Sequence, residues 1–231
     1  MGERWHDVDG IAPYVSVESL AVQGKYTHLA VTDRFPLAPP VLETGMVFPS
    51  TLRPQQQAVI TEATAAALRA LGFEHGVAHT ELMLTADGPV VIEVNARAGG
   101  ALPYLFPMAC DLDLIALAGR VALGELPTER PSFRGHAVFV MPQHPLGVLV
   151  ERVDGLDEVR ALDGVHVVIP MSLAGSRTDS FQHTVIAVVL GTATTGEQAV
   201  RLYHRVLAAV CAEYAPAQLP EHYRRSPTTV T

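Results

Sequence analysis

Residues 79–100 read HTELMLTADGPVVIEVNARAGG, and this stretch decides the fold. Two alternating segments flank the residues ADGP at 86–89, and the Asp-Gly pair within them favours a tight turn, so the stretch predicts an antiparallel β-hairpin. Alternate side chains of a strand share a face. One face of this hairpin is therefore expected to carry His79, Glu81 and Met83 from the first strand, and Glu93, Asn95 and Arg97 from the second.

The face that carries Glu81 has the donor groups of a hard-cation site. Folding the hairpin brings Glu81 opposite Glu93 and Asn95, so that two carboxylates and one amide oxygen meet. Oxygen ligands of this kind suit Mg²⁺. A solvated hairpin face would also carry polar residues, but here Glu81 lies in the otherwise apolar run ELML at 81–84, and Glu93 follows the apolar run VVI at 90–92. Burying two unpaired carboxylates would cost several kcal/mol, so the pattern favours a cation between them.

The end of the second strand adds an anion-binding element. Arg97 offers a guanidinium fork, and Gly99 and Gly100 let backbone N–H groups approach a ligand closely. A cation site, an arginine and a glycine turn therefore follow one another closely along the chain.

The composition indicates a folded protein with a substantial core. The chain has 231 residues, of which 48% are hydrophobic and 17% charged, enough for one domain or two small ones. A formal net charge of −8 argues against nucleic acid and anionic membranes as partners. Cys110 and Cys211 lack metal-ligand spacing and are expected to be buried thiols in a reducing compartment. No leader and no run of about 18 apolar residues is found, so a cytoplasmic location is expected.

The pattern along the chain predicts an α+β fold in two parts. The first, over residues 1–126, is an antiparallel sheet with covering helices, and the second, over 127–215, is a small β-rich α+β lobe followed by a tail at 216–231. Strands are expected at 14–22, 26–35, 41–48, 136–141, 147–153, 165–170 and 184–191, and helices at 54–71, 111–124, 155–162 and from 195 onward.

Some expectations concern single side chains outside the metal face. Val90, Ile92 and Val94 are expected to point into a core, and Val59 to lie in the buried stripe of the helix over 54–71. Glu18 lies in the middle of a strand, where it is either a solvent-facing residue or a ligand for an amine or metal. Arg34 is interpreted as a solvated surface residue.

These residues resemble those of a known family. The runs Glu81-x-Met83 and Glu93-Val-Asn95-Ala-Arg97-Ala-Gly-Gly100 are similar to the metal- and nucleotide-binding end of the ATP-grasp ligases. The resemblance is greatest to the carboxylate–amine ligase branch, which includes the L-amino-acid (dipeptide) ligases and carnosine synthase. It extends over most of the chain after about residue 10, including YVSVE at 14–18, ETG at 43–45 and AGRVALGEL at 118–126. Branches like biotin carboxylase or D-alanine–D-alanine ligase fit the motif less well.

The resemblance implies an ADP-forming ligase that uses ATP and Mg²⁺, or Mn²⁺ in its place. Such an enzyme activates a carboxylate as an acyl phosphate, which an amine, here expected to be an amino acid, then attacks. By position, Glu81, Glu93 and Asn95 would bind the metal, with Glu93 able to bridge two ions. Arg97 would bind the carboxylate substrate or the acyl phosphate, assisted by the backbone N–H groups of Gly99 and Gly100.

The resemblance also assigns the nucleotide and amine contacts. Met83 would form an apolar floor under adenine, and Leu82 is the weaker candidate because it faces the other side of the strand. His79 would contact phosphate or support the metal ligands, although a structural histidine is an equal alternative. Glu18 becomes a candidate for binding the incoming amine.

The sequence departs from the family in length. Ligases of this branch are roughly twice as long and carry an upstream α/β domain and a lid with phosphate-binding lysines. The lysine here, Lys25, lies in an expected turn and is a poor substitute. Three interpretations stay open: the C-terminal part of a ligase that needs a partner chain or self-association to supply the lid; an inactive remnant that still binds Mg²⁺ and nucleotide; or a binding module without catalysis. The retained Glu81, Glu93, Asn95 and Arg97 argue against the third.

Overall fold

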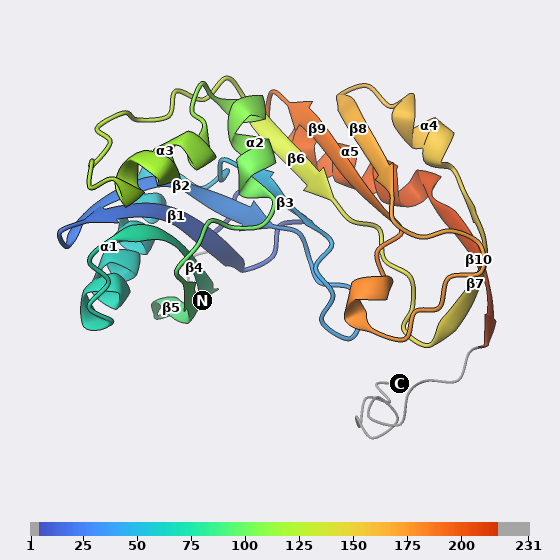
Figure 1. Ribbon diagram of the computed structural model, residues 1–231. Helices are drawn as coiled ribbons and strands as arrows, with labels where there is room; N and C mark the ends of the chain where they lie inside the picture. Colours follow the sequence, from blue (N-terminus) through green and yellow to red (C-terminus); the bar gives the residue numbers. More distant parts are fainter. Residues whose placement is uncertain (1–4, 217–231) are drawn as a thin grey trace. The chain divides into compact units, whose positions relative to one another are not determined.

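The computed structural model describes residues 5–216, and Figure 1 shows the order of the elements. Contacts between residues divide the chain into two compact units. Among the described residues, the first consists of residues 5–35, 46–138 and 192–200, and the second of residues 36–45, 139–191 and 201–216. The division into parts at residue 126 stays a prediction, and 217–231 of the expected tail lie outside the described residues.

An antiparallel sheet organises the first unit. The strands β5, β4, β1, β2 and β3 lie side by side in that order, so β5 forms an edge. The expected hairpin is confirmed, because β4 pairs with β5 in antiparallel register around the turn after Thr85. The bounds are β1 Tyr14–Val22, β2 Lys25–Arg34, β3 Gly45–Phe48, β4 Gly76–Thr85, β5 Gly88–Asn95 and β6 His136–Val140.

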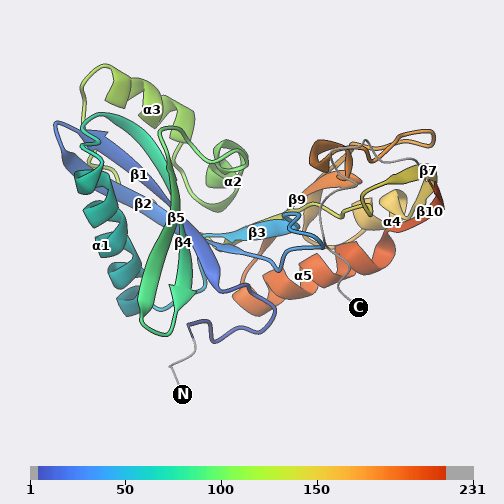
Figure 2. The ribbon, with the colours of Figure 1, turned by 90° about the horizontal axis from the view of Figure 1, so that it is seen from below.

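Helices cover the two faces of this sheet. Figures 1 and 2 show α1, Pro54–Ala70, on one side of the strands, and α2, Leu102–Ala109, with α3, Leu114–Ala122, on the other. These layers confirm the expected α+β class. The side chain of Asp113 caps α3 by accepting hydrogen bonds from the backbone N–H groups of Ile115 and Ala116.

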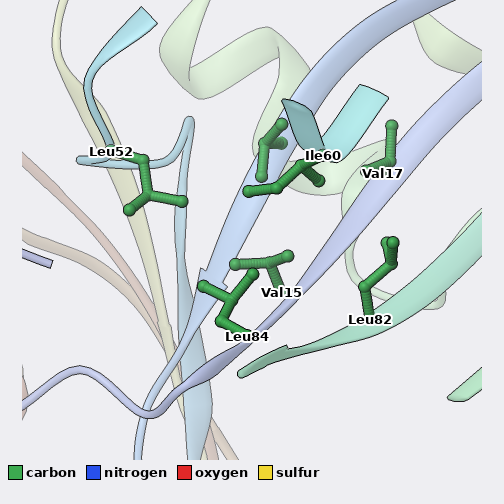
Figure 3. Close-up of a cluster of buried hydrophobic side chains, with 7 residues drawn as sticks. Val15, Val17, Leu52, Ile60, Leu82 and Leu84 are labelled. Carbon is green, nitrogen blue, oxygen red and sulfur yellow. The ribbon is translucent and has the colours of Figure 1, made fainter. Parts of the chain in front are cut away.

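A compact apolar core lies between α1 and the sheet, and Figure 3 shows its side chains. The helix contributes Ile60, whereas the expected Val59 is 47% exposed. The buried stripe of α1 is therefore shifted by one residue relative to the prediction. Trp5 packs against the same core and donates its indole N–H to the carbonyl oxygen of Thr85 at 2.9 Å. The core residues are Val15, Val17, Val31, Leu52, Ile60, Leu82 and Leu84.

A β-bulge changes the expected faces of β5. Glu81 pairs with Glu93, but the next residue on β4, Leu82, pairs with Val91, and the register shift leaves Ile92 as the extra residue. Val90 therefore pairs with Met83 and lies on the face of Glu81, not opposite it. Val90 is 55% and Ile92 51% exposed, so the prediction that they point into a core is wrong.

The second unit is built from short strands, as predicted. β8, Val165–Pro170, pairs antiparallel with β9, Ala187–Ala193, while β7, Val148–Asp154, pairs with β10, Cys211–Pro216. The helices are α4, Leu156–Arg160, and α5, Gly196–Ala209, of which residues 201–209 belong to this unit, with a short 3₁₀ turn at Phe181–His183. Cys110 is buried as expected, but Cys211 is exposed. Among the described residues, no helix is both long enough and apolar enough to cross a membrane.

Candidate metal and nucleotide site

A buried charge network, defined as Glu18, Arg34, His79 and Glu81, lies on the sheet face opposite α1. Glu18 is fully buried and lies directly opposite His79 in the pairing of β1 with β4. One of its carboxylate oxygens, Oε1, contacts His79 Nδ1, and the other accepts the backbone N–H of Gly99 at 3.2 Å. Both oxygens of Glu18 therefore have partners within the protein.

His79 connects Glu18 to Glu81. Its second ring nitrogen, Nε2, lies 3.2 Å from Glu81 Oε1. Burial by itself lowers the pKa of His79, but the hydrogen bonds to Glu18 and Glu81 outweigh burial and raise this pKa to about 9. The imidazole is thus a charged bridge between two carboxylates at neutral pH.

Arg34 is the cation of the network that the sequence did not identify. Its side chain is 3% exposed, so the interpretation as a solvated surface residue is wrong. Arg34 Nη2 donates to Glu81 Oε1 at 2.9 Å and lies 3.2 Å from His79 Nε2. The hydrogen bond from His79 and the charge of Arg34 hold the pKa of the Glu81 carboxyl below its ordinary value, against the opposing effect of burial. Glu81 therefore stays ionised.

The predicted metal ligands lie in register on one face. Glu93 on β5 is directly opposite Glu81, and Asn95 is opposite His79. Glu93 is exposed and accepts a hydrogen bond from Asn95 Nδ2 at 2.7 Å. Within residues 5–216 no three His, Cys, Asp or Glu side chains gather closely enough to hold a metal ion by themselves. Two carboxylates and one amide oxygen still fit Mg²⁺ in donor type, and nucleotide phosphates and water commonly complete such sites.

Two buried hydroxyl groups extend this face. Ser16 lies opposite Glu81 across β1 and β4, and Thr32 lies opposite Ser16 across β1 and β2. In the described part of the chain neither Ser16 Oγ nor Thr32 Oγ1 has a hydrogen-bond partner. Buried polar atoms of this kind are usually satisfied by water or a ligand.

The arginine and glycines after β5 differ from one another in exposure. Arg97 is exposed, and its Nη1 donates to the carbonyl oxygen of Ala98 at 3.0 Å. Gly99 is buried, and a Cβ there would lie 2.6 Å from His79 Nδ1. Gly100 is exposed, with no atom within 4 Å of a Cβ. Gly99 is thus required for packing onto His79, while Gly100 leaves its backbone open to solvent.

The candidate adenine residues lie on different faces. Met83 is 38% exposed and pairs with the exposed Val90, so the two form an apolar surface beside the carboxylates. The sequence analysis missed Val90, because the bulge that turns it toward Met83 has no clear signature in the sequence. Leu82 is fully buried in the core on the α1 side, where Figure 3 shows it, and is a core residue in this structure.

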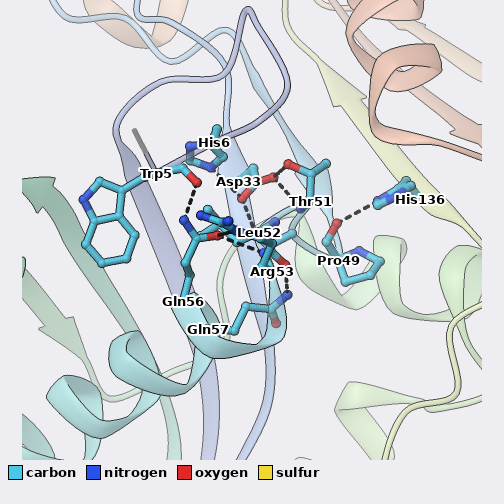
Figure 4. Close-up of polar contacts among 11 residues, drawn as sticks. Trp5, His6, Asp33, Pro49, Thr51, Leu52, Arg53, Gln56, Gln57 and His136 are labelled. Carbon is cyan, nitrogen blue, oxygen red and sulfur yellow. Dashed lines mark hydrogen bonds and ion pairs between the residues drawn. The ribbon is translucent and has the colours of Figure 1, made fainter. Parts of the chain in front are cut away.

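A second polar network supports the strand that carries Arg34. The fully buried Asp33 accepts hydrogen bonds from the Ser50 hydroxyl at 2.5 Å and from the backbone N–H and hydroxyl of Thr51 at 2.7 and 2.8 Å. His6 Nε2 lies 3.1 Å from the same carboxylate (Figure 4). The sequence feature that could have indicated this network is the pair Asp33-Arg34 at the end of a largely apolar strand.

Comparisons with known proteins show what the chain is similar to. Residues 13–103 match the family described as the ATP-grasp domain. The chain is 37% identical to human carnosine synthase 1 over 132 residues, which are 54% of this chain and 16% of that protein. It is 32% identical to alanine–anticapsin ligase of Bacillus subtilis over 97 residues, 42% of this chain and 20% of that protein. The chain thus matches only a small part of each of these curated relatives.

Among solved structures, the L-amino acid ligase from Bacillus licheniformis is similar with a TM-score of 0.75. The sequences are 24% identical, and the match covers 90% of this chain and 55% of that one, so the similarity concerns the fold. N5-carboxyaminoimidazole ribonucleotide synthetase from Thermotoga maritima is similar with a TM-score of 0.64 and 16% identity, covering 90% of this chain and 53% of that one. Residues 13–103 are therefore similar to an ATP-grasp domain, and the fold of the chain resembles that of about half of an L-amino acid ligase.

Proposed function

We propose that this chain is the metal- and acyl-phosphate-binding part of a Mg²⁺-dependent ATP-grasp ligase. The reaction is the transfer of the γ-phosphoryl group of ATP to a carboxylate, followed by attack of an amine, so that an amide forms and ADP and phosphate leave. The names of the relatives, carnosine synthase and alanine–anticapsin ligase, favour an amino acid as the amine.

One observation carries the proposal: Glu81 and Glu93 are direct cross-strand partners, and Asn95 is hydrogen-bonded to Glu93 on the same face. Arg34 and His79 already balance the charge of Glu81 at Oε1, and the remaining carboxylate and amide oxygens on this face form a donor set that suits a divalent cation. A bound Mg²⁺ or Mn²⁺ would neutralise charge on the β- and γ-phosphates. The protein's part is to hold the ion with these three side chains and to orient the phosphates.

Residues around the ion bind the reacting anion and the base. Arg97 is an exposed guanidinium that can pair with the carboxylate or its acyl phosphate, and the open backbone at Gly100 can donate to the same oxygens. Met83 and Val90 offer an apolar surface for adenine. For Glu18 the contacts favour a different role from amine binding, because both of its oxygens already have partners. We assign Glu18 and His79 to holding the Gly99 turn in place.

The match covers about half of the L-amino acid ligase. We infer that complete activity depends on further residues that supply a nucleotide lid. We propose that a partner chain or a further segment provides them. Self-association is the alternative arrangement. Both would act in the cytoplasm on small-molecule substrates.

The test is complementation in solution. The chain is mixed with the lid-bearing half of an L-amino acid ligase, ATP, Mg²⁺ and a panel of amino acids, and ADP and amide products are measured by mass spectrometry. We expect ADP release with the wild-type chain and loss of at least about 100-fold with Glu93→Ala, because the ion would lose a charged ligand. Nucleotide binding without ADP release across the panel would contradict the ligase and favour a remnant that binds Mg²⁺ and ATP.

A further inference from the structure

Arg34 occupies a constrained position at the end of β2. It pairs with Met46 of β3, and its neighbour Asp33 is held by Ser50 and Thr51 through hydrogen bonds of 2.5 to 2.8 Å. The Arg34 guanidinium carbon lies 5.8 Å from the centre of the Tyr14 ring, within the range of a cation–π contact. The backbone and the guanidinium are therefore fixed from both sides.

Arg34 reaches the predicted metal ligand Glu81 at one defined oxygen. Arg34 Nη2 and His79 Nε2 both contact Oε1, at 2.9 and 3.2 Å. In the described part of the chain both contacts fall on this oxygen, so Oε2 is the one that can face a cation. Two donors on one oxygen restrict rotation of the carboxylate about its last bond.

We propose that Arg34 is a positioning residue that holds the Glu81 carboxylate so that its second oxygen points toward the metal. This inference rests on the proposed function. It assigns Arg34 an effect on the metal site without contact to the ion, in the way that hydrogen-bonded partners orient metal ligands in other proteins.

A competing electrostatic effect predicts the opposite change in metal affinity when Arg34 is removed. Arg34 carries a positive charge close to a cation site, and by Coulomb's law alone its removal would strengthen metal binding. Positioning predicts weaker binding when Arg34 is removed. Arg34→Met distinguishes the two, because it keeps an unbranched apolar stem and removes both the charge and the donors. Arg34→Lys keeps the charge but lacks the planar fork.

Two measurements test the proposal, with Arg69→Met on the exposed face of α1 as the matched control. The first is calorimetric titration with Mn²⁺–ADP. We expect about tenfold weaker binding by Arg34→Met, a smaller loss for Arg34→Lys and no change in the control. Equal or tighter binding by Arg34→Met would overturn the proposal.

The second measurement is a pair of crystal structures without metal, of the wild type and of Arg34→Met. We expect the Glu81 carboxylate to leave His79 in the variant, and an unmoved carboxylate would overturn the proposal. If the wild type binds no Mn²⁺–ADP, the proposed function fails, while the crystal structures still decide whether Arg34 positions Glu81. If Arg34→Met does not fold, the same comparison is made with Arg34→Lys, for which a displaced carboxylate is expected.

Discussion

The two adjacent glycines after β5 provide a matched test of the buried charge network. A Cβ at Gly99 would lie 2.6 and 2.8 Å from atoms of the His79 ring and 2.9 Å from Leu102 Cδ2. The ring cannot retreat freely, because Glu18 and Glu81 hold its two nitrogens. At Gly100 no atom lies within 4 Å of the added carbon. An alanine Cβ would therefore clash with neighbouring side chains at position 99 but have free space at position 100.

The expected magnitude follows from two opposing terms. Overpacking a rigid site costs about 1–3 kcal/mol. Alanine also restricts the unfolded chain, which favours the folded state by about 0.4–1 kcal/mol. Gly99→Ala should therefore lower the free energy of unfolding by about 1–2 kcal/mol, and Gly100→Ala should leave it unchanged or raise it slightly.

The assay is urea unfolding followed by tryptophan fluorescence. The chain has a single tryptophan, Trp5, which packs against the core of the first unit and so reports on the unit that contains both glycines. Equal stability of Gly99→Ala and Gly100→Ala would refute the reasoning, because it would mean that His79 is not held where the network places it.

Three further predictions concern stability. Burial lowers the pKa of His144 to about 4, below its unfolded value near 6.5. The free energy of unfolding should therefore fall by about 3 kcal/mol as the pH falls from 6.5 to 4, because the unfolded state binds the proton first. Urea unfolding at several pH values should show a weaker dependence of this free energy on pH for His144→Gln. Asp33→Asn should lower the free energy of unfolding by about 3 kcal/mol in the tryptophan assay, because a buried carboxylate that accepts several hydrogen bonds is lost. Asp87→Asn in the exposed turn should change it little. Equal losses in the two variants would contradict this account. Gly155→Ala should destabilise the second unit much more than Gly175→Ala. Both glycines have φ near +90°, but only at Gly155 would the added Cβ meet a backbone oxygen, at 1.8 Å. Hydrogen exchange of the β7 and β10 amides measures the difference, and similar exchange rates in the two variants would count against this prediction.

The hairpin and the pairing of Glu81 with Glu93 could be predicted because their determinants are local. The Asp-Gly turn and the period-two alternation were enough to place Glu81 opposite Glu93. The bulge beside Glu81 depends on backbone geometry that no residue type there signals, so Val90 was assigned to the wrong face. The edge position of β5 could not be predicted either, because the consecutive apolar residues Val90, Val91 and Ile92 usually indicate a buried strand.

The charge network could not be predicted because its members are distant in sequence. Glu18 and His79 are brought together by the pairing of β1 with β4, and Arg34 reaches Glu81 from β2, on the other side of β1. A single arginine in a strand is most often a surface residue. Only the strand order reveals that three strands contribute charges to one buried point.

The helix α2 was missed for a local reason. Its eight residues include Pro103 and Pro107, and prolines normally argue against a helix. Pro103 lies in the first turn, where its missing N–H costs nothing. Pro107 lies near the C-terminal end, so few backbone hydrogen bonds are affected.

The central claim is that Glu81, Glu93 and Asn95 together hold a divalent ion with its nucleotide. Titration calorimetry of Mg²⁺–ATP into the chain measures this directly, with Glu93→Ala as the test and Glu62→Ala, on the exposed side of α1, as the control. We predict saturable binding by the wild type and the control, and at least about tenfold weaker binding by Glu93→Ala. Identical titration curves for all three proteins would contradict the claim.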